Sequence, residues 1–242
     1  MRVVVTRPRH SGERTMRRLT QMGLDPLLLP LAEPVHHVEE ARRALLTTQG
    51  AVAVTSAEAL RVLAVLGSDI EPHLGRPLFA VGKATAREAA ELGFSNIAVS
   101  EGAGAELAAL ISRHSGGRNA APLLYLAGFP RAAGFEAGLA ELHLPFLTVE
   151  CYRMRDIIPD DVTLRRFFSD ARADAVLLYS HETARRFFSL SFVGHNMELF
   201  AETRFLCLSD AVASAVPETL QSHVDIADMP NEDRLLALLI RA

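Results

Sequence analysis

Short runs of apolar residues alternate along the chain with stretches in which apolar residues recur at helical spacing. The short runs are apolar at consecutive positions, as Val3, Val4 and Val5 illustrate. Strands that are apolar on both faces and alternate with helices are typical of an α/β protein with a doubly wound parallel sheet. The expected strands span residues 3–5, 26–31, 51–54, 78–81, 96–99, 123–126, 146–149, 175–178, 205–208 and 224–226. The expected helices span residues 11–22, 57–66, 84–92, 105–113, 132–142, 182–190, 211–216 and 232–240.

An internal repeat indicates how these units are grouped. The similar segments are 52–61 with 176–185, 79–86 with 206–213, 106–111 with 234–239 and, out of order, 139–144 with 19–24. Each similarity is weak by itself, because strand–helix units resemble one another in composition. The common order of all four indicates a duplication in which the N-terminal unit completes the C-terminal set.

The repeat predicts two similar doubly wound domains, one of which is discontinuous. Residues 1–32 and 157–242 are expected to form the discontinuous domain, and residues 39–148 the inserted one. Segments 33–38 and 149–156 would then join the domains as a two-stranded hinge. In such an arrangement the cleft between the lobes is the natural place for a ligand.

Composition narrows the class of protein. The chain has 242 residues, of which 49% are hydrophobic and 22% charged, the balance of an ordinary soluble globular protein. A net charge of -4 gives no reason to expect a nucleic-acid partner. Cys151 and Cys207 stand far apart and match neither a disulfide framework nor a zinc site. With no membrane-spanning segment or signal peptide in view, we expect a cytoplasmic protein, and nothing indicates more than a monomer.

Two known sequence motifs are only partly present, because other residues that they require are missing. Gly82-Lys83 does not complete a P-loop, because Pro77 stands where that motif needs a glycine. His181-Glu182 does not complete a zinc-protease helix, because Arg185 stands in place of the second histidine. These two motifs therefore indicate neither a phosphate-binding loop nor a zinc site.

Small polar residues recur where a strand ends and a helix begins. They are Thr6, Thr55, Ser56, Thr85, Ser100, Ser180 and Ser209. Each alone is explained by helix capping. Together they favour a dispersed anion-binding surface, because helix N-termini suit anions and these turns gather at the carboxyl edge of a parallel sheet. Arg7, Arg9, Lys83 and Arg131 lie in or beside these turns and could bind anions or be ordinary surface charges.

Five segments, taken in order, resemble the uroporphyrinogen-III synthase family over nearly the whole chain. They read VTRP from Val5, PLLLPL from Pro26, VTSAEALRVL from Val54, AVGKATAREAAELGF from Ala80 and VECYRM from Val149. The resemblance implies two α/β domains joined by a two-stranded ladder, with no metal and no organic cofactor. It also implies cyclisation of the linear tetrapyrrole hydroxymethylbilane, with loss of water and inversion of ring D through a spiro intermediate.

The resemblance implies functional roles for particular residues. Tyr152 matches the tyrosine of the second crossing strand, which implies a catalytic hydroxyl; an aromatic plug that steadies the hinge is the alternative. Substrate-binding roles are implied for Thr55, Ser56, Thr85 and Ser180.

One turn departs from the family pattern of Gly-Pro-x-Thr. This chain has Ser209, Asp210, Ala211 and Val212 there. Val212 lacks the family's hydroxyl, and Asp210 adds a negative charge at an expected anion-binding turn.

Two other functions are compatible with two lobes and a cleft. The first is a cytosolic small-molecule binding module without catalysis. The second is a nucleotide-sugar transferase, which is less favoured because the chain is short and has no convincing diphosphate loop.

Overall fold

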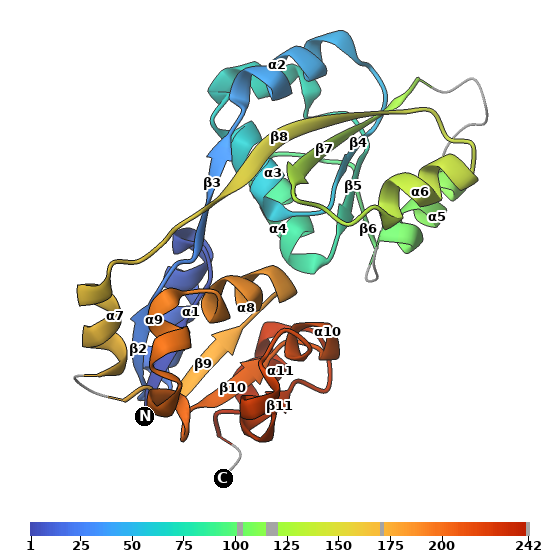
Figure 1. Ribbon diagram of the computed structural model, residues 1–242. Helices are drawn as coiled ribbons and strands as arrows, with labels where there is room; N and C mark the ends of the chain where they lie inside the picture. Colours follow the sequence, from blue (N-terminus) through green and yellow to red (C-terminus); the bar gives the residue numbers. More distant parts are fainter. Residues whose placement is uncertain (101–103, 115–120, 170–171, 241–242) are drawn as a thin grey trace. The chain divides into compact units, whose positions relative to one another are not determined.

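The chain forms two compact α/β units. The computed structural model describes residues 1–100, 104–114, 121–169 and 172–240. The first unit comprises Met1–Glu33 with Arg155–Ala242, and the second comprises Pro34–Met154. Alternating strands and helices with parallel pairing in both units confirm the predicted fold class (Figure 1).

Within the described residues, the first unit contains a parallel five-stranded sheet in the order β2-β1-β9-β10-β11. The strands are β1 (Arg2–Val5), β2 (Asp25–Leu28), β9 (Ala175–Leu178), β10 (Arg204–Cys207) and β11 (Val224–Ile226). The helices are α1 (Arg9–Gln21), α7 (Asp161–Phe168), α8 (His181–Phe188), α9 (Ser191–His195), α10 (Asp210–Ala213) and α11 (Glu232–Ala237), with 3-10 turns at Met197–Phe200 and Glu218–His223. Figure 1 shows β9, β10 and β11 running side by side in this unit.

Both faces of this sheet are covered, which is why its strands are apolar at successive positions. Val3, Val4 and Val5 are all 0% exposed. Val4 faces a cluster that includes Phe187, whereas Val3 and Val5 face a cluster on the other side that includes Leu235. Alternate strand residues therefore enter two different cores.

In the second unit, the described residues form a six-stranded sheet in the order β3-β8-β7-β4-β5-β6. Its strands are β3 (Ala32–His36), β4 (Val52–Val54), β5 (Leu78–Val81), β6 (Ile97–Ser100), β7 (Leu123–Phe129) and β8 (Phe146–Asp156). Its helices are α2 (Val38–Thr47), α3 (Ala57–Ala64), α4 (Lys83–Leu92), α5 (Gly104–His114) and α6 (Gly134–Glu141), with a 3-10 turn at Gly67–His73. The chain passes between the units within β3 and β8, which are neighbours in this sheet.

The two sheets have the same strand order when they are compared as the repeat suggests. Strands β4, β5 and β6 then correspond to β9, β10 and β11, and strands β7 and β8 correspond to β1 and β2. In each sheet the order reverses once, between β4 and β7 and between β9 and β1. Such a switch point opens a crevice at the carboxyl ends of the strands, where ligands of doubly wound folds bind.

Some expected boundaries were wrong. Helix α1 begins at Arg9 with Pro8 as its N-cap, so Ser11 lies inside the helix and does not cap it. The first helical bond runs from the Gly12 N–H to the Pro8 carbonyl, 2.8 Å away. Helices α2, α7 and α9 were not predicted. β8 runs from Phe146 to Asp156, so the expected strand 146–149 and the expected hinge segment 149–156 form one continuous strand.

Candidate functional site

The carboxyl edge of the second unit's sheet brings together several of the predicted residues. Thr55 and Ser56 follow β4, and Arg131 follows β7 after one intervening residue. These two strands flank the switch point. Tyr152 lies on β8, the next strand in the sheet.

Thr55 hydrogen-bonds to a tyrosine that sequence reasoning did not select. Its Oγ1 lies 2.9 Å from the hydroxyl oxygen of Tyr125, which is on β7. Tyr125 is only 1% exposed, whereas Thr55 is half-buried. Burial raises the pKa of Tyr125, and the bond to Thr55 only partly opposes this shift. The phenol therefore stays protonated at neutral pH and can donate a hydrogen bond.

Tyr152 lies against the backbone of β7. The register pairs it with Gly128, next to an irregularity between Ala127 and Gly128. A Cβ built at Gly128 would stand 2.2 Å from the Tyr152 Cζ and 2.5 Å from its hydroxyl oxygen. Only glycine leaves room for the ring there. Burial raises the pKa of Tyr152 while the neighbouring Ser56 hydroxyl opposes the shift, so this phenol is also protonated at neutral pH.

Ser56 caps α3, as the capping interpretation of these residues predicts. Its Oγ accepts a hydrogen bond from the Glu58 N–H at 3.2 Å. The Glu58 carboxylate in turn lies 2.7 Å from His36 Nε2 and accepts from Arg61 at 2.5 Å. Arg61 also donates to Glu88 at 2.7 Å. These hydrogen bonds and ion pairs hold the first turn of α3, which directly follows Thr55 and Ser56.

Arg131 is already paired within its own unit. Its Nε and Nη2 donate to the two carboxylate oxygens of Glu136 at 2.9 and 3.2 Å, and Thr148 donates to the same carboxylate at 2.8 Å. The hydrogen bond from Arg131 is the largest cause of the lowered pKa of Glu136. An anion that binds Arg131 must therefore compete with a bidentate internal carboxylate.

Lys83 and Thr85 lie in the first turn of α4, after β5. Lys83 is exposed, whereas Thr85 is only 6% exposed. The N-cap of α4 is Gly82, whose φ of 77° suits glycine, and no side chain caps the helix. The suggestion that Thr85 caps this helix is therefore wrong.

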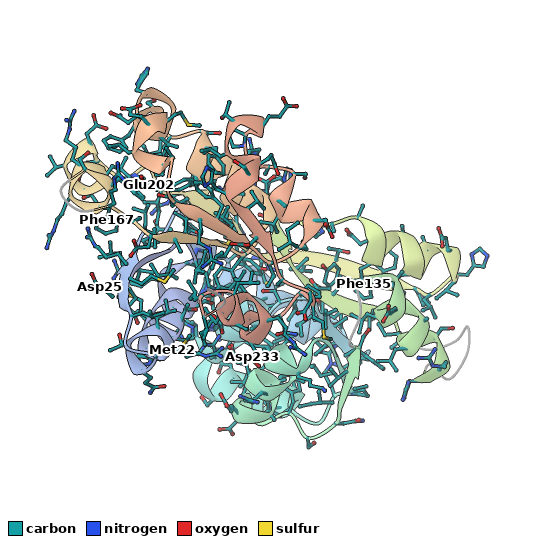
Figure 2. The ribbon with its side chains drawn as sticks, turned by 90° about the horizontal axis from the view of Figure 1, so that it is seen from below. Met22, Asp25, Phe135, Phe167, Glu202 and Asp233 are labelled. Carbon is teal, nitrogen blue, oxygen red and sulfur yellow. The ribbon has the colours of Figure 1, made fainter. Side chains whose placement is uncertain are left out.

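The carboxyl edge of the first unit is occupied by a carboxylate of the chain itself, Glu232, at the start of α11. Tyr179, which follows β9, donates to Glu232 Oε1 at 2.9 Å, and Arg7 donates to the same oxygen at 2.8 Å. Thr15, from α1, donates to Oε1 at 2.5 Å, and Arg18 donates to Oε2 at 3.0 Å. Figure 2 marks the neighbouring Asp233 on α11, to which Arg18 also donates.

These donors determine the charge of Glu232. Burial alone would raise its pKa, but the bonds from Thr15 and Tyr179 and the charges of Arg7 and Arg18 outweigh it, and the pKa is lowered. Burial, followed by the charge of Glu232, raises the pKa of Tyr179. The Arg7 guanidinium also lies 4.2 Å from the centre of the Tyr179 ring. Arg7 is therefore part of an internal ion-pair cluster.

The other predicted residues of this unit differ in their surroundings. Ser180 caps α8, and its Oγ accepts from the Thr183 N–H at 3.1 Å. Ser209 is the N-cap residue of the short helix α10 but makes no capping bond through its side chain. Arg9 is 76% exposed and lies 3.8 Å from Glu13. Thr6 is buried and donates to the Leu177 carbonyl at 2.7 Å.

Sequence reasoning therefore missed Tyr125, Tyr179 and Glu232. The repeat contained one usable signal, because it aligns Thr55-Ser56 with Tyr179-Ser180. Nothing local distinguishes Tyr125 from the apolar residues around it in β7.

Cys151 and Cys207 are not placed as nucleophiles. Both are 0% exposed, and burial raises the pKa of each thiol to about 12. Among residues 1–100, 104–114, 121–169 and 172–240, no group of three or more His, Cys, Asp or Glu side chains is arranged to hold a metal. In the same ranges, no helix has the length and apolar character needed to cross a membrane.

Comparisons with known proteins point to one family. The model of the family described as uroporphyrinogen-III synthase HemD matches residues 13–237. A mutant uroporphyrinogen III synthase from Thermus thermophilus is 20% identical, with a TM-score of 0.61, over 100% of this chain and 98% of that one. The uroporphyrinogen-III synthetase of Helicobacter pylori is 16% identical, with a TM-score of 0.66, over 100% of this chain and 99% of that one. These two structures show that the fold is shared. A search of curated protein sequences found no match.

Proposed function

Because the chain belongs to the uroporphyrinogen-III synthase family, we propose that it converts hydroxymethylbilane to uroporphyrinogen III. The reaction closes the macrocycle with loss of water and inverts ring D through a spiro intermediate. In water alone the bilane closes without inversion to the type I isomer. The work of the protein is therefore to fold a flexible substrate so that the substituted carbon of ring D attacks. The family match over residues 13–237 carries this proposal.

Tyr152 is proposed as the catalytic residue. The bond between the hydroxymethyl carbon and its oxygen breaks, and the oxygen leaves as water with a proton supplied by the phenol. The substituted carbon of ring D forms a carbon–carbon bond to the methylene carbon that lost the oxygen, which gives the spiro intermediate. The bond from that ring D carbon to its original methylene bridge then breaks, and the bridge bonds instead to the unsubstituted α-carbon of ring D. That carbon loses its proton as the pyrrole regains its aromatic ring, and this proton restores the phenol. The Tyr152 phenol has its proton before the reaction, since burial raises its pKa further above neutral pH, and its hydroxyl can therefore donate to the leaving oxygen.

The acetate and propionate groups of the substrate need donors of hydrogen bonds. We propose that hydroxyls and helix starts at the two carboxyl edges supply them, which needs no strongly basic protein. The proposed substrate-binding residues are Thr55, Ser56, Lys83, Thr85 and Arg131 in the second unit and Arg7, Arg9, Ser180 and Ser209 in the first. Arg7 and Arg131 would exchange an internal carboxylate for one of the substrate.

Replacing Tyr152 with phenylalanine tests the catalytic assignment. Tyr152→Phe keeps the ring against Gly128 and removes only the hydroxyl. Turnover to the type III isomer is expected to fall by about 10²–10⁴, the range typical of a general acid, with an unchanged melting temperature. A variant that melts earlier yet turns over at the parental rate would make Tyr152 a structural residue.

A binding module without catalysis is not favoured, because the family that matches residues 13–237 is one of synthases. Such a module would bind the bilane and leave its spontaneous closure to the type I isomer unchanged.

We also propose that the chain acts in the cytoplasm as a monomer. Sedimentation of the purified protein at working concentration measures the oligomeric state, and a stable dimer would contradict this proposal.

A further inference from the structure

Resting on the proposed function, we propose that Tyr125 is a positioning residue that turns the Thr55 hydroxyl outward as a donor to a substrate carboxylate. Tyr125 itself does not meet the ligand, because it is 1% exposed. Its effect passes through one contact, the 2.9 Å hydrogen bond between the two hydroxyl oxygens.

The pairing of β4 and β7 brings these hydroxyls together. Tyr125 is directly opposite Ala53 in the parallel register. Thr55 lies two residues beyond Ala53, so it points to the same face of the sheet. The small side chain of Ala53 leaves the Tyr125 ring free to extend past it to Thr55. The contact therefore spans the two strands that flank the switch point.

Packing against Phe135 fixes the position of the Tyr125 ring. Phe135, labelled on α6 in Figure 2, packs edge-on against it, with ring centres 4.7 Å apart and an angle of 87°. Phe135 is 2% exposed and lies so close to Gly104 that a Cβ there would stand 2.7 Å from the Phe135 Cβ. The phenol consequently cannot swing away from Thr55 without disturbing this packing.

The direction of the hydrogen bond follows from counting protons. Each hydroxyl has one proton to donate, and among the described residues Thr55 is the hydrogen-bond partner of the Tyr125 hydroxyl. If Thr55 donated, the buried phenol proton would have no acceptor there, which is the more costly arrangement. Tyr125 therefore donates and Thr55 accepts. The proton of the half-buried Thr55 is then directed away from Tyr125 and is available to an anion.

A double-mutant cycle on binding tests this role. The probe is a bilane that lacks the hydroxymethyl group, so that it keeps its carboxylates and cannot cyclise. Calorimetry gives its dissociation constant for the parent, Tyr125→Phe, Thr55→Val and the double variant. We expect about threefold weaker binding for Tyr125→Phe and about tenfold for Thr55→Val. The double variant should bind no more weakly than Thr55→Val alone, because Tyr125 acts only through that hydroxyl.

Two further measurements separate positioning from general stability. With hydroxymethylbilane as substrate, Tyr125→Phe should raise KM and leave kcat within about twofold of the parental value. Thr203→Val is the matched control, because it removes a buried hydroxyl that donates to the Ala173 carbonyl at 2.8 Å. Thr203 directly precedes β10, so it lies at the amino end of that strand and not at the carboxyl edge of the sheet. It should lower the melting temperature without changing the dissociation constant.

The outcomes distinguish this inference from the proposed function. Multiplying effects in the double variant, or parental binding by Tyr125→Phe, would overturn the inference even if the parent makes the type III isomer. A coupled cycle in a parent that makes no type III isomer would overturn the function and leave the inference standing. A parent that neither binds the probe nor makes the type III isomer would overturn both.

Discussion

All three tyrosines of the chain lie at or near the carboxyl edges of its sheets, and each has its pKa raised mainly by burial. A protonated phenol is a hydrogen-bond donor, but the three donors have different partners. Tyr125 donates to Thr55 and Tyr179 donates to Glu232. Tyr152 is the tyrosine that we assign to the substrate.

The Tyr152 ring depends on the absence of a side chain at Gly128. Gly128→Ala would place a methyl group 2.2 Å from the Tyr152 Cζ, so the ring must move. We expect a loss of about 1–3 kcal/mol in the free energy of unfolding and a lower turnover to the type III isomer. Chemical denaturation and the isomer assay measure the two effects.

Gly134→Ala is the matched control for this substitution. Gly134 begins α6, and a Cβ there meets nothing within 4 Å. Its stability should stay level or rise slightly, because alanine is the better helix former. If Gly128→Ala instead matched Gly134→Ala in both stability and turnover, the close fit of Tyr152 on β7 would be refuted.

The strands were predictable because of how they are buried. β5 and β9 match the predicted bounds, since an apolar run covered on both faces needs no further information. β11 also matches its predicted bounds, although it is an edge strand that contains Asp225. α2 was missed because its buried face is built mainly from small residues, Ala41 and Ala44 with Leu45. α7 carried a start signal that was not used, an Asp160 that caps it by accepting from the Thr163 N–H at 2.7 Å.

The site was less predictable than the strands. Thr55 and Ser56 follow a recognisable strand, so a local rule locates them at a carboxyl edge. Tyr125 could not be found that way, because its contact with Thr55 depends on β7 lying beside β4, a strand far from it in the sequence. Glu232 likewise meets Arg7 only because two ends of the chain share one unit.

The contact between α1 and α11 through Glu232 should make stability depend on pH. Folding lowers the pKa of Glu232 below its ordinary value of 4.5. Its contribution is therefore complete above about pH 4.5 and is lost as the pH falls through the lowered value. At pH 7, Glu232→Gln should cost about 2 kcal/mol of unfolding free energy, because Arg7 and Arg18 lose their shared partner. The gap from the parent should narrow below pH 4.5.

Asp233→Asn controls for the general loss of charge on this helix. Asp233 also meets Arg18, but its side chain is 82% exposed, so its replacement should change stability little. Denaturation curves of both variants across pH 3–7 measure the difference. Equal, pH-independent effects of the two substitutions would show that the Glu232 cluster does not stabilise the first unit.

At the scale of the whole molecule, we propose that the first unit folds only when both ends of the chain are present. Residues 155–242 alone lack β1, which pairs with β9 through Val3, Val4 and Val5. Both cores would then lose buried residues, and an edge of β9 would be open. Residues 34–154 contain a complete second unit and are expected to unfold cooperatively on their own.

A circularly permuted chain gives the matched control. Joining residues 155–242 to residues 1–33 through a flexible linker restores every strand of the first unit and should restore a cooperative thermal transition. Thermal unfolding followed by circular dichroism compares residues 155–242, residues 34–154 and the permuted chain. A cooperative transition in residues 155–242 alone would contradict the discontinuous unit.

Isomer analysis tests the central claim most directly. Freshly prepared hydroxymethylbilane is incubated with and without the purified chain, the products are oxidised to porphyrins, and the type I and type III isomers are separated by chromatography. The sample without protein should give the type I isomer. The account predicts that the type III fraction rises with protein concentration until it dominates, and that Tyr152→Phe slows this rise while the type I background persists. A product that remains type I at every protein concentration would contradict the account.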